Sequence, residues 1–170
     1  MYTNVSAVTI PRRRSTLIIK KLKIRCTVIF ATPKYTMITS DNSLVKDHLE
    51  KGEVVGIPTE TVYGLAANVF NSKAVANIFT TKQRPTTNPL IVHVRDQKAA
   101  EKLGVFNATA QALAEAFWPG PLTLVLPLQP NAPVARAVTA GLPTIAIRCP
   151  SHPVMQALLL KSDLSLAAPS

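Results

Sequence analysis

From Ser40 onward, the chain alternates between segments with helical spacing of apolar residues and short apolar runs. Apolar residues three and four positions apart predict amphipathic helices, which we place from Asp41 to Gly52, from Ser72, over 108–117 and from Ser151 to Leu160. Apolar runs of strand length predict strands at 54–57, 90–94, 122–128, 144–149 and 164–168. We therefore expect an α/β or α+β fold in which helices flank a sheet.

The expected helix boundaries rest on capping residues and helix breakers. Ser40 or Asp41, Ser72 and Ser151 stand where a side-chain oxygen can accept a hydrogen bond from the first helical turn. Pro153 is compatible with that first turn. The sequence Trp118-Pro-Gly-Pro121 ends the 108–117 helix.

Residues 1–36 differ in kind from the rest of the chain. They hold eight basic residues and no acid, and they show neither helical spacing nor the turn residues of a compact element. We expect a basic N-terminal extension that is disordered or results from a start codon assigned too early, followed by a domain over 37–170. A targeting segment and a functional basic arm remain as alternatives.

The net charge of +10 belongs mostly to this extension. The other 134 residues carry the remaining 11 basic and 9 acidic groups, so charge alone does not predict that the domain binds nucleic acid. No apolar run approaches the length of a membrane span, and we expect a soluble protein. Cys26 and Cys149 fit free thiols in a reducing compartment, and the spacing of the three histidines predicts no metal site.

A polar segment, Pro58-Thr-Glu-Thr-Val-Tyr-Gly-Leu65, follows the predicted 54–57 strand. It places two hydroxyls, a carboxylate and a phenol at a strand end, where α/β folds bind ligands. A hydrogen-bonded loop without a ligand is the alternative.

A second segment, residues 82–90, joins a helix to a strand and carries Lys82 and Arg84. An extended backbone, favoured at Arg84 by the following proline, would point both side chains the same way. Two converging cations need an anion between them, and arginine suits phosphate. A solvated basic loop is the alternative.

Two predicted strands carry polar residues. His93 shares a strand face with Ile91, opposite Val92, and a packed histidine is the alternative to a ligand contact. On the 144–149 strand, Thr144 and Arg148 share one face, and a buried Arg148 would need an anionic partner. No Walker motif is present, so any phosphate must be held by side chains and strand ends.

The final segment, 164–168, reads as an interior strand, and the chain ends at Ser170. An interior strand needs neighbours on both sides, so we expect a C-terminally truncated domain with an exposed sheet edge and weak activity.

Six motifs in this order resemble the threonylcarbamoyl-AMP synthase family, which has a YrdC-like fold. They are Pro58–Leu65, Lys82-x-Arg-Pro85, Asn88–His93, Trp118–Thr123, Thr144-x-x-x-Arg148 and Ala168–Ser170. The resemblance covers about Ser43 to Ser170. It implies a twisted mixed sheet flanked by helices, with a large concave cavity.

The resemblance also implies ligand roles. L-Threonine is expected at Thr61, His93, Arg148 and Ala168, and ATP at Lys82, Arg84, Asn88, Thr144 and Ser170, with Lys82 and Arg84 as the catalytic cations. The family signature continues past the serine with an asparagine that this chain lacks, so we expect an incomplete ATP site.

The implied activity is synthesis of threonylcarbamoyl-AMP and pyrophosphate from L-threonine, bicarbonate and ATP in the cytoplasm. Magnesium would arrive with ATP, without a dedicated protein site. The product would pass to an enzyme that modifies an adenosine in transfer RNA. Alternatives are a carbamoyl-adenylate-forming paralogue, a double-stranded-RNA-binding module and an inactive fragment.

Overall fold

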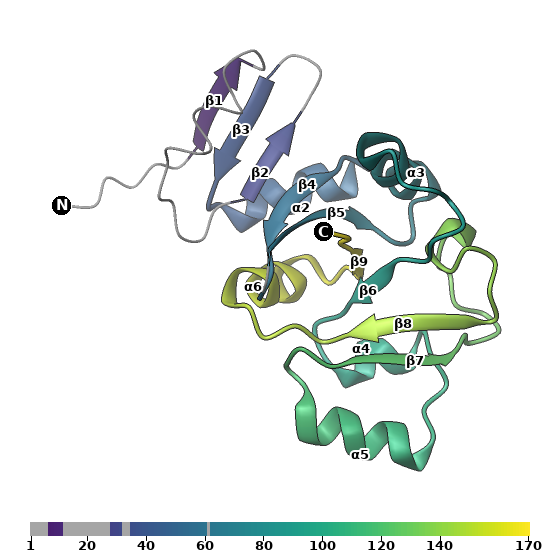
Figure 1. Ribbon diagram of the computed structural model, residues 1–170. Coiled ribbons are helices and arrows are strands. Elements are labelled where there is room, and N and C mark those ends of the chain that lie inside the picture. The colour runs from purple at the N-terminus through teal and green to yellow at the C-terminus, as the bar shows by residue number, and fades with distance from the viewer. Residues whose placement is uncertain (1–6, 12–27, 32–34, 61) are drawn as a thin grey trace.

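The computed structural model describes residues 7–11, 28–31, 35–60 and 62–170 (Figure 1). They form a nine-stranded sheet in the order β1-β3-β2-β4-β5-β9-β6-β8-β7. Only the pair β6–β8 is parallel among the described strand pairs, so the sheet is mixed, as predicted.

The strands are β1 (Ala7–Pro11), β2 (Val28–Ala31), β3 (Tyr35–Thr39), β4 (Val55–Pro58), β5 (Tyr63–Asn68), β6 (Ile91–His93), β7 (Thr123–Pro127), β8 (Thr144–Arg148) and β9 (Leu166–Ala167). The helices are α2 (Asn42–Glu50), α3 (Ser72–Lys82), α4 (Gln97–Glu101), α5 (Ala108–Phe117), α6 (Pro153–Ser162) and the 3-10 turn η1 (Arg136–Val138).

Two apolar clusters pack on opposite faces of the sheet. One cluster joins α3, α5 and η1 to the face of β6 and β8 that bears Val92, Ile145 and Ile147. The other joins α2 and α6 to β4, β5 and β9, with Ile57 and Leu158 fully buried. Because α2 and α6 pack only on β4, β5 and β9, the same face of β6, β8 and β7 has no covering helix, and Ile91 and Val125 are exposed there.

The N-terminal segment differs from the prediction. No element was expected before residue 37, but β1 and β2 lie there, and Met37 falls inside β3. β2 pairs with β4 through Ile29–Gly56 and Phe30–Val55, so these strands extend the sheet. The apolar residues of 7–11 and 28–31 did not lead to a strand prediction, because basic residues surround both segments. The domain boundary at residue 37 stays a prediction.

The N-cap positions of α2, α3 and α6 were predicted to within one residue, but in two of these helices another residue is the cap. Asp41 caps α2 as expected, but Asn71 caps α3 and His152 caps α6, in place of Ser72 and Ser151. In α3 the carboxamide oxygen of Asn71 accepts from two N–H groups, which places Ser72 inside the helix. β5 and α4 were not predicted.

The final strand is interior, as predicted, but both of its neighbours lie earlier in the chain. β9 pairs antiparallel with β5 through Ala67–Ala167 and with β6 through Val92–Ala167. The expectation that β9 would form an exposed edge was therefore wrong, because β1 and β7 are the edges of the described sheet.

Cys149 is a buried free thiol, and burial raises its pKa. Cys26 lies outside the described residues. Within the described ranges, no helix has the length and apolar character needed to cross a membrane.

Candidate functional site

The uncovered face of β6, β7 and β8, which we call the open face, carries His93, Thr144 and Arg148, three of the polar residues singled out in the sequence. Strand pairing places His93 opposite Arg148 and Ile91 opposite Ala146, while Val125 lies opposite Ala146 from the other side. Ile91 and Val125 are 39% and 68% exposed. The open face therefore has an apolar middle, with Arg148 at one end of β8 and Thr144 at the other.

The Arg148 guanidinium contacts two groups of the protein, a main-chain carbonyl and a carboxylate. Its Nε donates a hydrogen bond to the Gly120 carbonyl at 3.2 Å, and its Nη2 lies 2.8 Å from Oε2 of Glu60. The Gly120 carbonyl belongs to the 118–123 motif, where Trp118 Nε1 donates to the Leu122 carbonyl at 2.8 Å and Gly120 N donates to the Cys149 carbonyl at 2.8 Å. This motif thus shapes the loop that receives Arg148.

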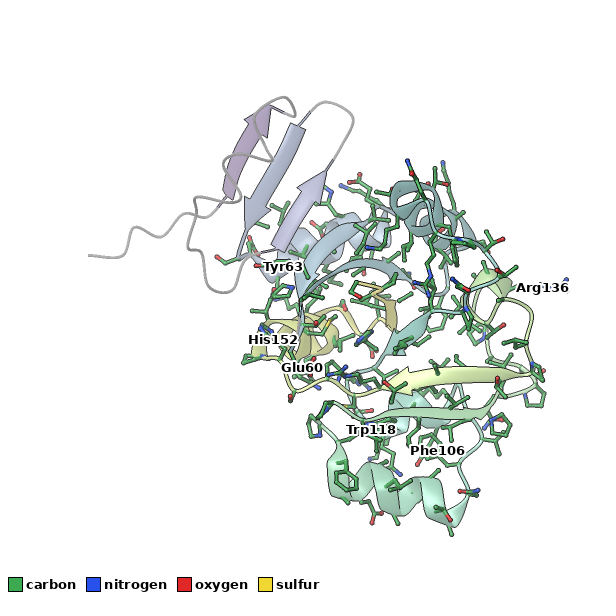
Figure 2. The ribbon with its side chains drawn as sticks, in the orientation of Figure 1. Glu60, Tyr63, Phe106, Trp118, Arg136 and His152 are labelled. Carbon is green, nitrogen blue, oxygen red and sulfur yellow. The ribbon has the colours of Figure 1, made fainter. Side chains whose placement is uncertain are left out.

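Glu60 reaches Arg148 from the turn between β4 and β5. Its Oε1 accepts from Ser151 N at 2.6 Å and from Ser151 Oγ at 3.3 Å. Burial acts to raise the pKa of Glu60, but hydrogen bonds from its own N–H and from Ser151, with the charge of Arg148, outweigh burial and lower that pKa. Figure 2 shows Glu60 near the arrowhead end of β8 and near His152 at the start of α6.

His93 is a buried, neutral histidine, with only 4% of its surface exposed. Burial, followed by the charge of Arg148, lowers its pKa to about 4, while Glu60 and the nearby carbonyls of Leu166 and Ile91 oppose this shift. Its Nδ1 lacks a hydrogen-bond partner among the described residues. A neutral imidazole with an unpaired nitrogen is suited to exchange a hydrogen bond with a ligand.

Ala168 lies against the start of β5, where Gly64 permits close approach. A Cβ added to Gly64 would lie 2.7 Å from the Ala168 carbonyl oxygen, and Leu65 N donates to the Pro169 carbonyl at 3.0 Å. Ala168 itself is buried. The small residues at both positions let two backbones meet beside the open face.

At the other end of β8, the 83–90 connection enters β6 beside Thr144, because β6 and β8 are parallel. Arg84 Nη2 donates to the Pro89 carbonyl at 3.3 Å, and Arg84 Nε is buried without a partner. Lys82 and Asn88 are exposed. The prediction of an extended backbone from Lys82 to Arg84 was wrong. Lys82 is the last residue of α3, and Gln83 adopts a left-handed conformation with φ 50°.

Four buried side-chain atoms lack a hydrogen bond in the described part of the chain: Glu60 Oε2, Arg84 Nε, His93 Nδ1 and Arg148 Nη2. Those of Glu60 and Arg148 face each other as an ion pair. Unsatisfied buried polar groups are rare in proteins and often mark binding sites. The other two, His93 Nδ1 and Arg84 Nε, have no partner of either kind among the described residues, and they lie toward the two ends of the open face.

The sequence-predicted site residues fall into two groups. His93, Arg148 and Ala168 come together at one end of the open face, while Arg84, Asn88 and Thr144 lie toward the other. Ser170 is exposed, and Thr61 lies outside the described residues. Sequence reasoning missed Glu60, Gly120 and Ser151 as partners of this site. Glu60 stood in the polar segment, but its contact with Arg148 spans 88 residues.

No group of three or more histidine, cysteine or acidic side chains that could hold a metal ion is found among the described residues. Arg148 and Arg84, which have described contacts, and the exposed Lys82 instead supply positive charge. Such a site favours an anionic ligand.

The comparison with known families decides the affiliation. The family model Sua5_yciO_yrdC, described as telomere recombination, matches residues 47–170. The chain belongs to the Sua5/YciO/YrdC family. All described residues of the open face lie within the matched region.

Relatives and solved structures agree with this family. The chain is 53% identical over 123 residues to threonylcarbamoyl-AMP synthase of Bacillus subtilis, covering 72% of this chain and 35% of that protein. It is 46% identical over 123 residues to threonylcarbamoyl-AMP synthase of Pyrococcus abyssi, covering 72% and 36%. The crystal structure of P. abyssi Sua5 complexed with L-threonine matches with a TM-score of 0.72 and 43% identity, over 76% of this chain and 38% of that one.

The chain therefore spans about a third of the length of these curated relatives.

Proposed function

We propose that the open face binds L-threonine and ATP and forms threonylcarbamoyl-AMP. The amine of threonine and bicarbonate give a carbamate with loss of water. A carbamate oxygen then attacks the α-phosphorus of ATP, and pyrophosphate leaves. The observation that carries this proposal is that His93 Nδ1 and Arg84 Nε, two buried polar atoms without a partner among the described residues, lie toward opposite ends of one sheet face, each in or beside a cationic group.

The two ends differ in the chemistry that they offer. Arg148, with neutral His93 beside it, suits an amino-acid carboxylate and its neighbouring polar groups. Arg84, Lys82, Asn88 and Thr144 suit phosphates. Thr144 and Arg148 are four residues apart on one strand, or about 13 Å at the usual rise, which leaves room for two adjacent ligands.

This chemistry needs no covalent nucleophile. Holding the carbamate and the α-phosphate in line removes most of the entropy cost of their reaction, and cations stabilise the charge that develops on the phosphate. In this proposal Lys82 and Arg84 supply that charge. Magnesium is expected to arrive on the nucleotide, where phosphates provide most of its ligands.

The same proposal includes the enzyme that receives the product and the compartment in which the reaction takes place. The product would be handed, in the cytoplasm, to an enzyme that transfers the threonylcarbamoyl group to an adenosine of transfer RNA. The names of the relatives and the L-threonine complex of P. abyssi Sua5 support the synthase reaction itself, from which this extension follows.

Pyrophosphate release tests the proposal directly. The purified 170-residue chain is incubated with ATP, magnesium and bicarbonate, with and without L-threonine. We expect pyrophosphate release that depends on both threonine and bicarbonate, and an adenylate product detected by mass spectrometry. Release that is independent of threonine would contradict the proposal.

A further inference from the structure

Glu60 links Arg148 to a fixed piece of main chain. One oxygen of its carboxylate faces Arg148 at 2.8 Å, and the other accepts the main-chain N–H of Ser151 at 2.6 Å. Ser151 directly precedes the residue that caps α6. The carboxylate therefore relates the position of the guanidinium to that of the backbone leading into a packed helix.

Two contacts together define the plane of the Arg148 guanidinium. Arginine is long and carries considerable rotamer freedom, which an unrestrained side chain would lose only when it binds its ligand. The Gly120 carbonyl accepts a hydrogen bond from Nε, and the Glu60 carboxylate forms an ion pair with Nη2 at 2.8 Å. A planar group that is restrained by a hydrogen bond at one nitrogen and an ion pair at another has little freedom to rotate. Its other N–H groups then point in a set direction before any ligand arrives.

Stability alone is a poor explanation for this ion pair. The side chains of Arg148 and Glu60 are only 15% and 19% exposed, and burying two charges costs about as much as their attraction returns. Glu60 also comes from a turn whose neighbours Val62 and Tyr63 are largely exposed, so little packing requires a carboxylate there. An ion pair of this kind is better explained by the orientation that it imposes.

We propose that Glu60 is a positioning residue, whose carboxylate orients the Arg148 guanidinium to receive the carboxylate of the amino-acid substrate. The identity of that ligand, L-threonine, rests on the proposed function. Glu60 itself does not touch the substrate in this proposal. It acts through Arg148 and therefore affects amino-acid binding without affecting ATP binding.

The variant Glu60→Gln tests the proposal with little change in size. Glutamine keeps an oxygen that can accept from Ser151 but removes the charge that faces Arg148. By calorimetry on the full chain, we expect L-threonine affinity to fall about 10-fold, on the scale of coupling between contacting residues, and ATP affinity to stay within about 2-fold. The matched control is Glu53→Gln, which removes a carboxylate charge 2.7 Å from His48 elsewhere in the chain and should change neither affinity.

A double-mutant cycle shows whether Glu60 acts through Arg148. In an Arg148→Ala background, Glu60→Gln should weaken threonine binding no further. An equal loss in both backgrounds would overturn the proposal, because Glu60 would then contact the substrate directly. Tighter threonine binding by Glu60→Gln would also overturn it, because Glu60 would then compete with the substrate for Arg148.

A ligand-independent readout separates this proposal from the proposed function. The Nε–H resonance of Arg148 in a nitrogen-15 NMR spectrum should shift or broaden in Glu60→Gln, while that of Arg95, paired with Asp163, should not. An unchanged Arg148 resonance would overturn the positioning role. If the unaltered chain bound no threonine, the proposed function would fail, and the resonance alone would decide the role of Glu60.

Discussion

His93 and Arg148 are direct neighbours on the parallel strands β6 and β8, so a buried neutral imidazole lies beside a fixed guanidinium. Protonating His93 would place a second positive charge there, out of water. The electrostatic character of this end of the open face therefore depends on His93 remaining uncharged, which it does at neutral pH because its pKa is about 4.

The first prediction concerns the pH dependence of stability. Between pH 6.5 and about 4, the unfolded chain binds a proton at His93 that the folded chain does not, so stability should fall as pH falls through this window. The loss attributable to His93 should be about 3 kcal/mol. Urea unfolding at several pH values checks this, and His93→Gln should flatten the slope.

Glu60 affects the pH dependence of stability in a lower pH range than His93 does. Its pKa is lowered from 4.5, so its contribution is present above that pH and is lost as pH falls through the folded-state pKa. An unchanged slope between pH 6.5 and 4.5 in His93→Gln would show that another group controls stability there.

The second prediction concerns Arg148. Arg148→Ala should weaken L-threonine binding by about 10- to 100-fold, the scale of lost hydrogen bonds to a charged group, and should leave ATP affinity within about 3-fold. Calorimetry with each ligand measures both effects. Arg95→Ala is the matched control, because Arg95 is also partly buried and paired with acids, but lies outside the open face. Normal threonine affinity in Arg148→Ala would contradict the assigned role.

The third prediction concerns the phosphate end. Arg84→Ala and Lys82→Ala should each reduce threonine-dependent pyrophosphate release by about 100-fold, the scale of a lost transition-state contact. Circular dichroism should show an intact fold, because Lys82 is exposed and Arg84 makes a single described hydrogen bond, to Pro89. Lys98→Ala in α4 serves as the control for loss of an exposed cation. Full activity in both site variants would refute the assignment.

The fourth prediction concerns the close approach of Gly64 and Ala168. A Cβ at position 64 would meet a main-chain oxygen at 2.7 Å, so Gly64→Ala should displace the 168–169 backbone and destabilise the fold by about 1–3 kcal/mol. Threonine affinity should fall as well, because Ala168 borders the amino-acid end. Gly104→Ala provides the comparison, since its Cβ would meet only side chains of the opposite core. Unchanged melting temperature and affinity in Gly64→Ala would contradict the prediction.

The parts of the site that the sequence predicted are those with local signals. The alternation of apolar and polar residues in 90–94 and 144–149 correctly placed His93 and Val92 on opposite faces of their strand, and Arg148 and Thr144 on the same face of theirs. The two-residue period of a strand needs only a few consecutive residues to be recognised. The family affiliation was predicted from the order of six motifs and is confirmed by the match over 47–170.

The parts that were missed depend on distant contacts or on weak local signals. β5 contains glycine and alanines and lacks β-branched residues, so its strand character comes from pairing with β4 and β9. The contact of Glu60 with Ser151 spans 91 residues, a distance over which one sequence gives no pairing signal. Lys82 was expected in the loop after the helix, but it is the last residue of α3. The left-handed conformation of Gln83 then changes the direction of the chain before Arg84.

The two residues of β9 have a consequence for how this protein folds. The strands β1 to β5 come from residues 7–68 and the strands β6 to β8 from residues 91–148. Among the strands that the structure describes, these two halves of the sheet are joined only through β9. The pairings within each half join residues that are at most 55 positions apart, as in Ile91–Ala146, whereas β9 must find β5 across 100 positions, as in Ala67–Ala167. Contacts of such long sequence separation form slowly, because closing the loop costs entropy before the pairing repays it. The amino-acid end of the open face, which needs both halves, is therefore expected to be assembled in a late step of folding.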